Sequence, residues 1–224
     1  MAQRKDFNSI FVTIMKFVKN TWLPDNDTHF EKFIDDEGNY QKEQFDCVVK
    51  YIKPENKGLF IDIGAHVGLW SRMAQKVGFK DILAIEPDEK NYECLDKNLN
   101  KAFISRLGLS DKKTTGKIKS EKENNSGANY LIDGQDFPVE PFDRYFSFIK
   151  DEFDLTKQIL IKIDVQGYED KVVKGMTNFI KQYKPIIIVE QWLDGKEDLR
   201  ATEYCASLGM KVLEKIKKEV ILGW

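Results

Sequence analysis

The sequence predicts an α/β fold in which helices cover both faces of a mostly parallel sheet. Short apolar runs alternate with amphipathic stretches along most of the chain, which is typical of βαβ units. The runs LFI, ILAI, ILIKI and PIIIV are apolar without alternation, as expected for parallel strands buried on both faces. No repeat of fixed period is visible. We therefore expect one α/β domain over residues 56–224, preceded by an N-terminal extension over residues 1–55.

The first half of this domain contains five predicted elements. They follow the order strand, helix, strand, helix, strand over residues 59–64, 69–78, 81–87, 88–101 and 103–110. Gly78 is a plausible C-cap for the first helix, and Pro87 stops the second strand. Asp88 is a candidate N-cap for the second helix because its carboxylate can accept a backbone N–H of the first turn.

The second half continues the alternation of strands and helices and then ends with two consecutive strands. Its elements follow the order strand, helix, strand, helix, strand, strand over residues 158–167, 170–183, 184–192, 197–208, 210–216 and 219–224. Apolar residues gather on one side of the first of these helices, as the helical period requires: Val172, Val173, Met176, Phe179 and Ile180. A Lys-Lys turn joins the last two strands, so we expect an antiparallel hairpin at the C-terminal end.

Three stretches do not follow this rhythm. Residues 40–53 form a predicted amphipathic helix, whereas residues 6–20 fit either a helix or β structure. Residues 111–141 are rich in Lys, Glu, Asn, Ser and Gly, and we expect an inserted loop or hairpin there. Such an insertion is either a cover for a functional site or a mobile surface loop.

Composition and charge exclude several classes of protein. The chain is 42% hydrophobic and 32% charged, as in ordinary folded proteins, and its net charge of -2 gives no general reason to bind nucleic acid or anionic membranes. No run approaches the roughly 20 apolar residues that span a bilayer, and no signal-peptide cleavage pattern follows the N-terminus. The three cysteines, Cys47, Cys94 and Cys205, form no C-x-x-C pair, so we expect a cytoplasmic protein without disulfides.

The motif FIDIGAHVG, residues 60–68, is the first candidate site. A buried strand leads into a turn with Gly64 and Gly68, and glycines there let the backbone turn tightly and approach a ligand. Asp62 interrupts the apolar strand, and a buried carboxylate needs donors or a cation nearby. The alternative is that both glycines serve only the packing of the strand against the next helix.

Glu86, at the end of the next strand, completes the predicted ligand site. An acid at this position of an open α/β sheet accepts hydrogen bonds from ribose hydroxyls, which predicts a nucleoside ligand. A dinucleotide is the competing ligand, but its fingerprint G-x-G-x-x-G is replaced here by G-x-x-x-G. Asp62 would repel a pyrophosphate, whereas it suits a cationic group such as a sulfonium.

The motif IKIDVQGYED, residues 161–170, adds polar side chains at the same predicted edge. Lys162 and Asp164 are two residues apart on a strand, so they share a face and are candidates to contact substrate. Gly167 turns the chain. Glu169 and Asp170 open the next helix, where acids are more readily explained by the helix dipole.

Glu190 follows the apolar run IIIV and so places another carboxylate at the end of a predicted strand. If its strand neighbours that of Asp164, the two carboxylates would face one substrate and could share a proton or hold a divalent metal. The sequence decides between neither role, so Asp164 and Glu190 are the candidate ligands if a metal binds.

The segment TWLPDNDTHF, residues 21–30, is a further candidate substrate site. Aromatic and acidic side chains such as Trp22, Asp27 and His29 suit sugar recognition, because a ring stacks on the sugar and carboxylates bind hydroxyls. The equally supported alternative is a surface turn formed by Pro-Asp-Asn.

The blocks FIDIGAHVG, ILAIEPDEKNYECLDKNL, RLGLSD, ILIKIDVQGYEDKVVKGM and KPIIIVE resemble FkbM-type methyltransferases over roughly residues 55–192. The resemblance implies the Rossmann-like class I methyltransferase fold with a seven-stranded sheet. It implies S-adenosylmethionine as cofactor and mainly O-methylation, often of sugars or sugar-bearing metabolites. Two residues depart from the family pattern. Gln166 stands where the family usually has Glu, which puts any substrate or metal role of that position in doubt, and His66 replaces a frequent Asn.

The resemblance also implies roles for individual residues. Those at the methionine end of the cofactor are Asp62, Gly64, Ala65, His66 and Gly68. Glu86 binds the ribose, and Asp164, which matches the Asp of the family block, is a further cofactor contact. The residues near adenine are Pro87, Leu109, Ser110 and Asp111. Further candidate substrate contacts are Lys162, Gln166 and Glu190.

The combined hypothesis is direct displacement of a methyl group by a hydroxyl of a small or carbohydrate-like acceptor. Asp164 is the first candidate base and His29 the second. A protein or nucleic-acid methyltransferase is the first alternative, although the Pro-Pro-Tyr, Pro-Pro-Phe and Pro-Cys signatures of DNA methyltransferases are absent from the sequence. A non-catalytic binding module is the second alternative, and the presence of both Asp62 and Glu86 argues against it. The sequence does not predict the oligomeric state.

Overall fold

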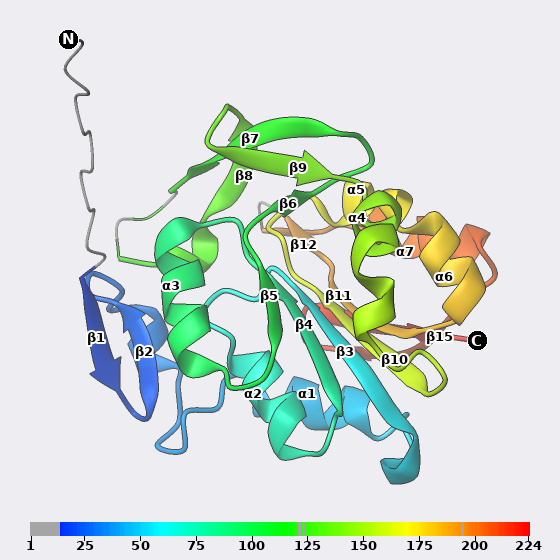
Figure 1. Cartoon of the computed structure of the whole chain (residues 1–224), viewed down its shortest axis with the longest axis horizontal. Helices are drawn as coiled ribbons and strands as arrows, with labels where there is room; N and C mark the ends of the chain where they lie inside the picture. Colours follow the sequence, from blue (N-terminus) through cyan, green and yellow to red (C-terminus); the bar gives the residue numbers. More distant parts are fainter. Residues whose placement is uncertain (1–13, 121, 123, 194) are drawn as a thin grey trace, which may run out of the picture.

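A seven-stranded sheet forms the centre of the computed structural model, which describes residues 14–120, 122, 124–193 and 195–224 (Figure 1). In spatial order its strands are β14 (Lys211–Ile216), β15 (Glu219–Gly223), β11 (Ile186–Glu190), β10 (Gln158–Ile163), β3 (Lys57–Ile63), β4 (Asp81–Ile85) and β5 (Phe103–Ser105). The five strands from β11 to β5 are parallel, and β15 is antiparallel to both β11 and β14. The predicted α/β class with a C-terminal antiparallel hairpin is confirmed.

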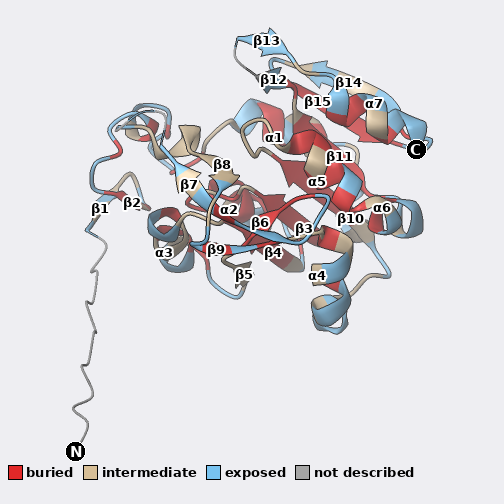
Figure 2. Cartoon of the chain, turned by 90° about the horizontal axis from the view of Figure 1, so that it is seen from above, coloured by how far each residue is buried: buried red, intermediate tan, exposed pale blue. Residues whose placement is uncertain are grey.

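Helices cover both faces of this sheet. They are α1 (Lys42–Val49), α2 (Leu69–Lys76), α3 (Glu89–Asn98), α4 (Phe142–Ile149), α5 (Glu169–Gly175), α6 (Thr177–Tyr183) and α7 (Arg200–Ser207). Side chains of β3 alternate between two cores: Leu59 and Ile61 pack with α4 to α7, whereas Phe60 packs with α1 to α3. The central strands are consequently buried along almost their whole length (Figure 2).

The segment expected as an inserted loop or hairpin at 111–141 instead holds most of a second sheet. Its strands, in spatial order, are β6 (Gly108–Leu109), β9 (Phe137–Glu140), β7 (Thr114–Lys119) and β8 (Tyr130–Asp133). This sheet lies above the carboxyl ends of the central strands (Figure 1). Gly108 and Gly116 permit it, because a Cβ on either would contact Phe137 and Val139 of β9 within 3.4 Å. The segment therefore covers one end of the main sheet.

Two predicted elements are divided in the structure. The strand expected over 103–110 ends at Ser105, and the chain then enters the second sheet as β6. The helix expected over 170–183 becomes α5 and α6, which are separated at Met176. Gly175, at the end of α5, lies so close to Ser110 that a Cβ would be 2.1 Å from the Ser110 carbonyl oxygen. Both divisions arise from contacts between segments far apart in the sequence.

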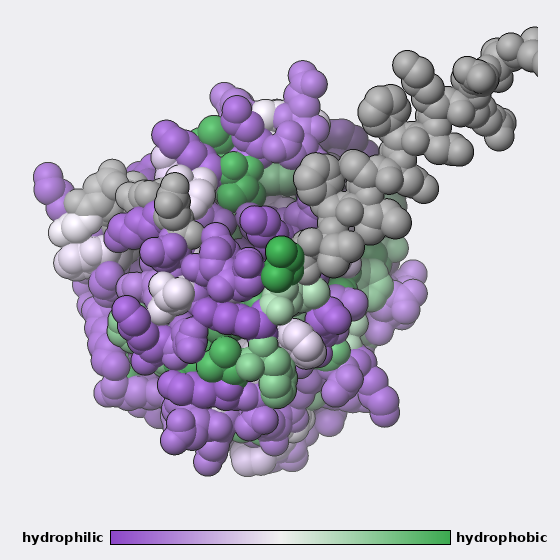
Figure 3. All heavy atoms as spheres, turned by 90° about the vertical axis from the view of Figure 1, so that its left-hand side faces the viewer, coloured by the Kyte–Doolittle hydropathy of each residue, from purple (hydrophilic) through white to green (hydrophobic). Residues whose placement is uncertain are grey.

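The N-terminal extension begins, within the described residues, with the hairpin of β1 (Met15–Val18) and β2 (Thr21–Pro24). For the undecided stretch 6–20, the described part is therefore β structure, and residues 6–13 lie outside the described residues. The molecular face bearing this hairpin is dominated by hydrophilic side chains with single apolar ones between them (Figure 3). Among the described residues, no helix has both the length and the apolar character needed to cross a membrane.

Candidate functional site

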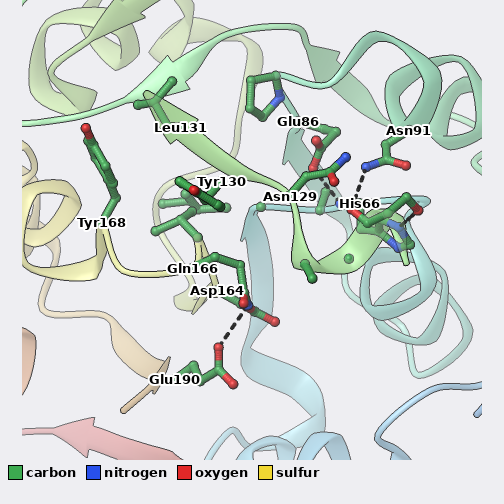
Figure 4. Close-up of a pocket in the computed structure, with 18 of the residues that line it drawn as sticks. His66, Glu86, Asn91, Asn129, Tyr130, Leu131, Asp164, Gln166, Tyr168 and Glu190 are labelled. Atoms are coloured by element: carbon green, nitrogen blue, oxygen red, sulfur yellow. Dashed lines mark hydrogen bonds between the residues drawn. The ribbon is translucent and has the colours of Figure 1, made fainter. Parts of the chain in front are cut away.

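A cavity of about 730 Å³ lies at the carboxyl ends of the parallel strands (Figure 4). Its floor is formed where four neighbouring strands end, with Gly64 after β3, Glu86 after β4, Asp164 after β10 and Glu190 at the end of β11. Ligands of open α/β sheets bind at this edge. Residues 125–131, which lead into and form β8, provide part of the opposite wall.

The glycine loop brings β3 and β10 unusually close together. Gly64 has φ +73°, and the N–H groups of Gly64 and Ala65 both donate to the Ile85 carbonyl. A Cβ on Gly64 would lie 1.9 Å from the Asp164 carbonyl oxygen, so only glycine fits. Gly64, Ala65 and His66 line the cavity, whereas Gly68 does not: it caps α2 with φ +85° and faces Leu95.

We expect Gly64→Ala to lower the free energy of unfolding by about 3 kcal/mol or more, since the methyl group adds a clash to the strain of a positive φ. Gly78→Ala is the matched control. Gly78 has φ +92° but no atom within 4 Å of its Cβ position, so only the strain of about 1 kcal/mol applies. Urea denaturation of both variants measures the difference, and equal losses would contradict the close approach at Gly64.

Asp62 does not line the cavity, in contrast to its predicted place beside the ligand. Its carboxylate is fully buried, and one oxygen accepts the N–H and hydroxyl of Ser71 at 3.1 and 2.7 Å. The other oxygen lies 3.6 Å from the Lys162 ammonium. Lys162 is paired with Asp62 in the register of β3 and β10, so the donors that this buried acid requires come from the protein.

Lys162 connects the floor of the cavity to this buried acid. Its Nζ donates to the Gly64 carbonyl at 3.2 Å and lies 3.4 Å from Asp164, and the side chain lines the cavity. Burial alone would lower the pKa of Lys162, but Asp164 and Asp62 outweigh it and raise this pKa. Lys162 is therefore a fixed positive charge between two carboxylates.

Asp164 and Glu190 form a carboxyl pair in the cavity, as shown with Gln166 in Figure 4. The Gln166 amide donates to Asp164 at 2.7 Å and to Glu190 at 3.0 Å. Burial would raise the pKa of Asp164, but Lys162 and the hydrogen bonds from Gln166 and Glu190 hold it below its usual value. Burial and the neighbouring Asp164 raise the pKa of Glu190 to about 9. The surroundings thus favour the ionised form of Asp164 and the protonated form of Glu190.

This pair predicts a pH dependence of stability. Because the pKa of Glu190 is raised to about 9, the folded state binds its proton more tightly than the unfolded state. The resulting stabilisation is complete below the ordinary pKa of 4.5 and is lost as the pH rises toward 9. We expect Glu190→Gln, whose amide can replace the protonated acid, to lose less stability than the wild type between about pH 6 and about pH 9.

Denaturant unfolding across that pH range checks this expectation. Glu197→Gln is the control, because Glu197, on β13 (Lys196–Glu197), is exposed and pairs with Lys215. If wild type and Glu190→Gln lost stability equally, the carboxyl pair would not hold its extra proton.

Glu86 lies at the other end of the cavity floor. Its carboxylate accepts the backbone N–H groups of His66 and Asp88 at 2.8 and 3.0 Å, and no described residue forms a salt bridge with it. Burial raises the pKa of Glu86 to about 8. Pro87 and Leu109 line the cavity nearby. Ser110 and Asp111 do not, because Ser110 is buried against α5 and Asp111 is exposed.

The structure separates the candidates of the N-terminal segment. His29 lines the cavity, but Trp22 and Asp27 do not. The Asp27 carboxylate is 1% exposed and is occupied by the N–H of Phe30 and by both donors of Ser126. Trp22 bonds through its backbone to Asn98 and packs under Lys97. Neither is placed to contact a substrate, so their predicted substrate role does not fit the structure.

Several residues of the cavity wall were not identified from the sequence. They are mostly aromatic or amide side chains: Tyr40, Gln41, Trp70, Asn91, Asn129, Tyr130, Tyr168 and Trp192. Tyr130 and Asn129 come from the segment that gave no periodic signal, and Tyr40 precedes the helix α1. The one local signal for a site residue in this sequence is a polar residue at the end of an apolar strand. The wall residues do not occupy such positions.

Comparison with known proteins gives one match at the level of family. The sequence matches the family model described as "Methyltransferase FkbM domain" over residues 62–206. A search of curated proteins finds no match.

The comparison with solved structures gives further similarities. The chain is similar to methyltransferase FkbM from Methylobacillus flagellatus KT, with 18% identity and a TM-score of 0.48 over 75% of this chain and 44% of that chain. It is also similar to a precorrin-6y C5,15-methyltransferase from Geobacter metallireducens GS-15, with 14% identity and a TM-score of 0.49 over 85% and 95% of the chains. A ribosomal protein L11 methylase from Lactobacillus delbrueckii subsp. bulgaricus has 15% identity and a TM-score of 0.42 over 84% and 80%. The chain spans less than half the length of the first of these proteins.

Proposed function

Since this chain belongs to the FkbM methyltransferase family, we propose that it transfers the methyl group of S-adenosylmethionine to a hydroxyl oxygen of a small molecule or glycan. One observation carries this proposal: the buried Glu86 and the Asp164–Glu190 carboxyl pair lie at strand ends of one cavity, on either side of the glycine loop that follows β3.

The residues of the cavity fit this cofactor. Glu86 is buried without a cationic partner among the described residues, so its oxygens suit the hydroxyl donors of a ribose. Gly64, Ala65 and His66 would face the amino-acid portion, and Pro87 and Leu109 the adenine. When bound, S-adenosylmethionine would supply an electrophilic methyl group.

The chain would then provide alignment and a proton acceptor. Holding two reactants in line can lower a barrier by about 7–11 kcal/mol. Asp164 is the proposed base, because Lys162 keeps it ionised at neutral pH and it lies in the cavity. Gln166 donates hydrogen bonds to both Asp164 and Glu190 and so orients the carboxylate of Asp164. His29, which also lines the cavity, remains the second candidate base.

The surroundings of Asp164 and Glu190 do not favour a divalent metal between these two carboxyl groups. The space between Asp164 and Glu190 is bridged by the Gln166 amide nitrogen, and Lys162 already supplies a positive charge 3.4 Å from Asp164. Hard cations such as Mg²⁺ bind oxygen ligands. An amide N–H donor that faces both carboxyl groups occupies the oxygens that such a cation would need. We therefore expect methyl transfer to continue in the presence of EDTA.

Two measurements test the proposal. Calorimetry with S-adenosylmethionine should give a saturable binding heat, and a methyl-transfer screen over hydroxylated sugars and small alcohols, with EDTA or with Mg²⁺, should reveal an acceptor. Absence of binding at millimolar S-adenosylmethionine would overturn the cofactor assignment. Transfer only to RNA or protein would replace the proposed acceptor class.

A further inference from the structure

A partly buried hydrogen-bond relay joins three segments that are far apart in the sequence. Asp27 follows β2, His66 lies in the glycine loop, and Ser126 begins a short 3₁₀ helix, Ser126–Ala128, in the cavity wall. Ser126 Oγ donates to Asp27 Oδ2 at 2.5 Å, and His66 Nε2 lies 2.6 Å from the same Oγ. No part of this relay was expected from the sequence.

The direction of the relay follows from its donors. Asp27 Oδ2 also accepts the backbone N–H of Ser126 at 2.9 Å, and Oδ1 accepts the N–H of Phe30 at 2.7 Å, so the carboxylate acts as an acceptor throughout. The single hydroxyl proton of Ser126 therefore points to Asp27. Ser126 Oγ must then accept from His66, which requires the proton on Nε2 and leaves Nδ1 unprotonated. Nδ1 is buried and has no hydrogen-bond partner among the residues that the structure describes.

His66 needs this support because of its backbone. Its φ of +52° lies in the left-handed region, which few residues other than glycine adopt. In this conformation the His66 N–H donates to Glu86 Oε2 at 2.8 Å. The ring also packs edge-on against Phe30, with centroids 4.4 Å apart. The relay thus holds the peptide that orients the carboxylate of Glu86.

We propose that Asp27 is a positioning residue of the cofactor site, which acts through Ser126 to fix His66 as its neutral Nε2–H tautomer and thereby holds Glu86 in place. The effect on cofactor affinity rests on the proposed function, whereas the tautomer does not. Burial lowers the pKa of His66 to about 4, which is consistent with a neutral ring.

The tautomer can be observed directly, because the chain contains only two histidines. Long-range ¹H–¹⁵N spectra of protein labelled with ¹⁵N-histidine distinguish Nε2–H from Nδ1–H, and His29→Gln assigns the signals. The wild type should show Nε2–H at His66. In Asp27→Asn the side-chain amide can donate to Ser126 Oγ and turn its proton toward His66, so Nδ1–H should gain population. Ser126→Ala should also abolish the single preferred tautomer.

The cofactor readout is separate. Asp27→Asn should raise the Kd of S-adenosylmethionine about tenfold, as for the loss of one hydrogen bond to a charged group, with a smaller change in kcat. Asp35→Asn is the matched control: Asp35 also accepts backbone N–H groups, but from Glu37 and Asn39, which do not line the cavity, whereas Asp27 bonds the wall residue Ser126. It should leave both the tautomer and the Kd unchanged.

The outcomes separate the two proposals. An Nδ1–H tautomer in the wild type, or an unchanged tautomer in both Asp27→Asn and Ser126→Ala, would overturn the positioning role. An unchanged Kd in Asp27→Asn would overturn its effect on Glu86. If the tautomers behave as expected but the wild type binds no S-adenosylmethionine, the proposed function fails while the relay that fixes His66 stands.

Discussion

Asp164→Asn is expected to lower kcat by about 10²–10⁴-fold, the usual contribution of a general base, while the Kd of S-adenosylmethionine changes less than about threefold. Asparagine has nearly the same shape and can still accept the hydrogen bond from Gln166, but it cannot take a proton from a hydroxyl. Glu86 and the glycine loop, which are proposed to hold the cofactor, bond to other partners. Single-turnover methyl transfer and calorimetry on the same variant separate the two effects.

The control for Asp164→Asn is Asp170→Asn. Asp170 lies on α5, pairs with Lys174 and Arg200, and does not line the cavity, so its loss should affect stability more than turnover. Normal turnover by Asp164→Asn would show that Asp164 is not the base. His29→Asn would then be the next variant to measure.

The sequence predicted which residues meet at the strand ends, and the reason is physical. In a parallel sheet every carboxyl end lies on one edge, so a polar residue that ends an apolar run is placed there by its position alone. Gly64, Glu86, Asp164 and Glu190 all line the cavity on this basis. The alternation of apolar runs with amphipathic stretches predicted the α/β class, and the Lys-Lys turn between the last two strands predicted the C-terminal hairpin.

Partners could not be predicted in the same way. The pattern around Asp62 showed that a buried acid needs donors, but it did not identify them. Ser71 comes from the helix α2, and Lys162 is brought to Asp62 by the register of β3 and β10. Asp27 likewise bonds Ser126 across 99 positions of sequence. The wall formed by Asn129 and Tyr130 depends on such long-range contacts, which no local pattern encodes.

Glu86→Ala is expected to raise the Kd of S-adenosylmethionine about 100-fold. Two hydrogen bonds from ribose hydroxyls to this buried acid contribute about 1.5 kcal/mol each, the upper limit for uncharged partners, about 3 kcal/mol in total. The substitution also leaves the N–H groups of His66 and Asp88 without their acceptor, which loosens the glycine loop. Glu89→Ala is the control, because Glu89 is an exposed partner of Arg106 at the start of α3.

Burial of Glu86 is unfavourable for folding at alkaline pH, since a carboxyl with its pKa raised to about 8 must ionise there without a cation. Removing it should therefore cost less stability above pH 8 than at pH 6. Because burial of this acid destabilises the fold at alkaline pH, we infer that Glu86 serves to bind a ligand. Scanning calorimetry of wild type and Glu86→Ala at pH 6 and above pH 8 measures the stability difference, and titration calorimetry with S-adenosylmethionine measures the Kd. An unchanged Kd in Glu86→Ala would show that this acid serves only the glycine loop.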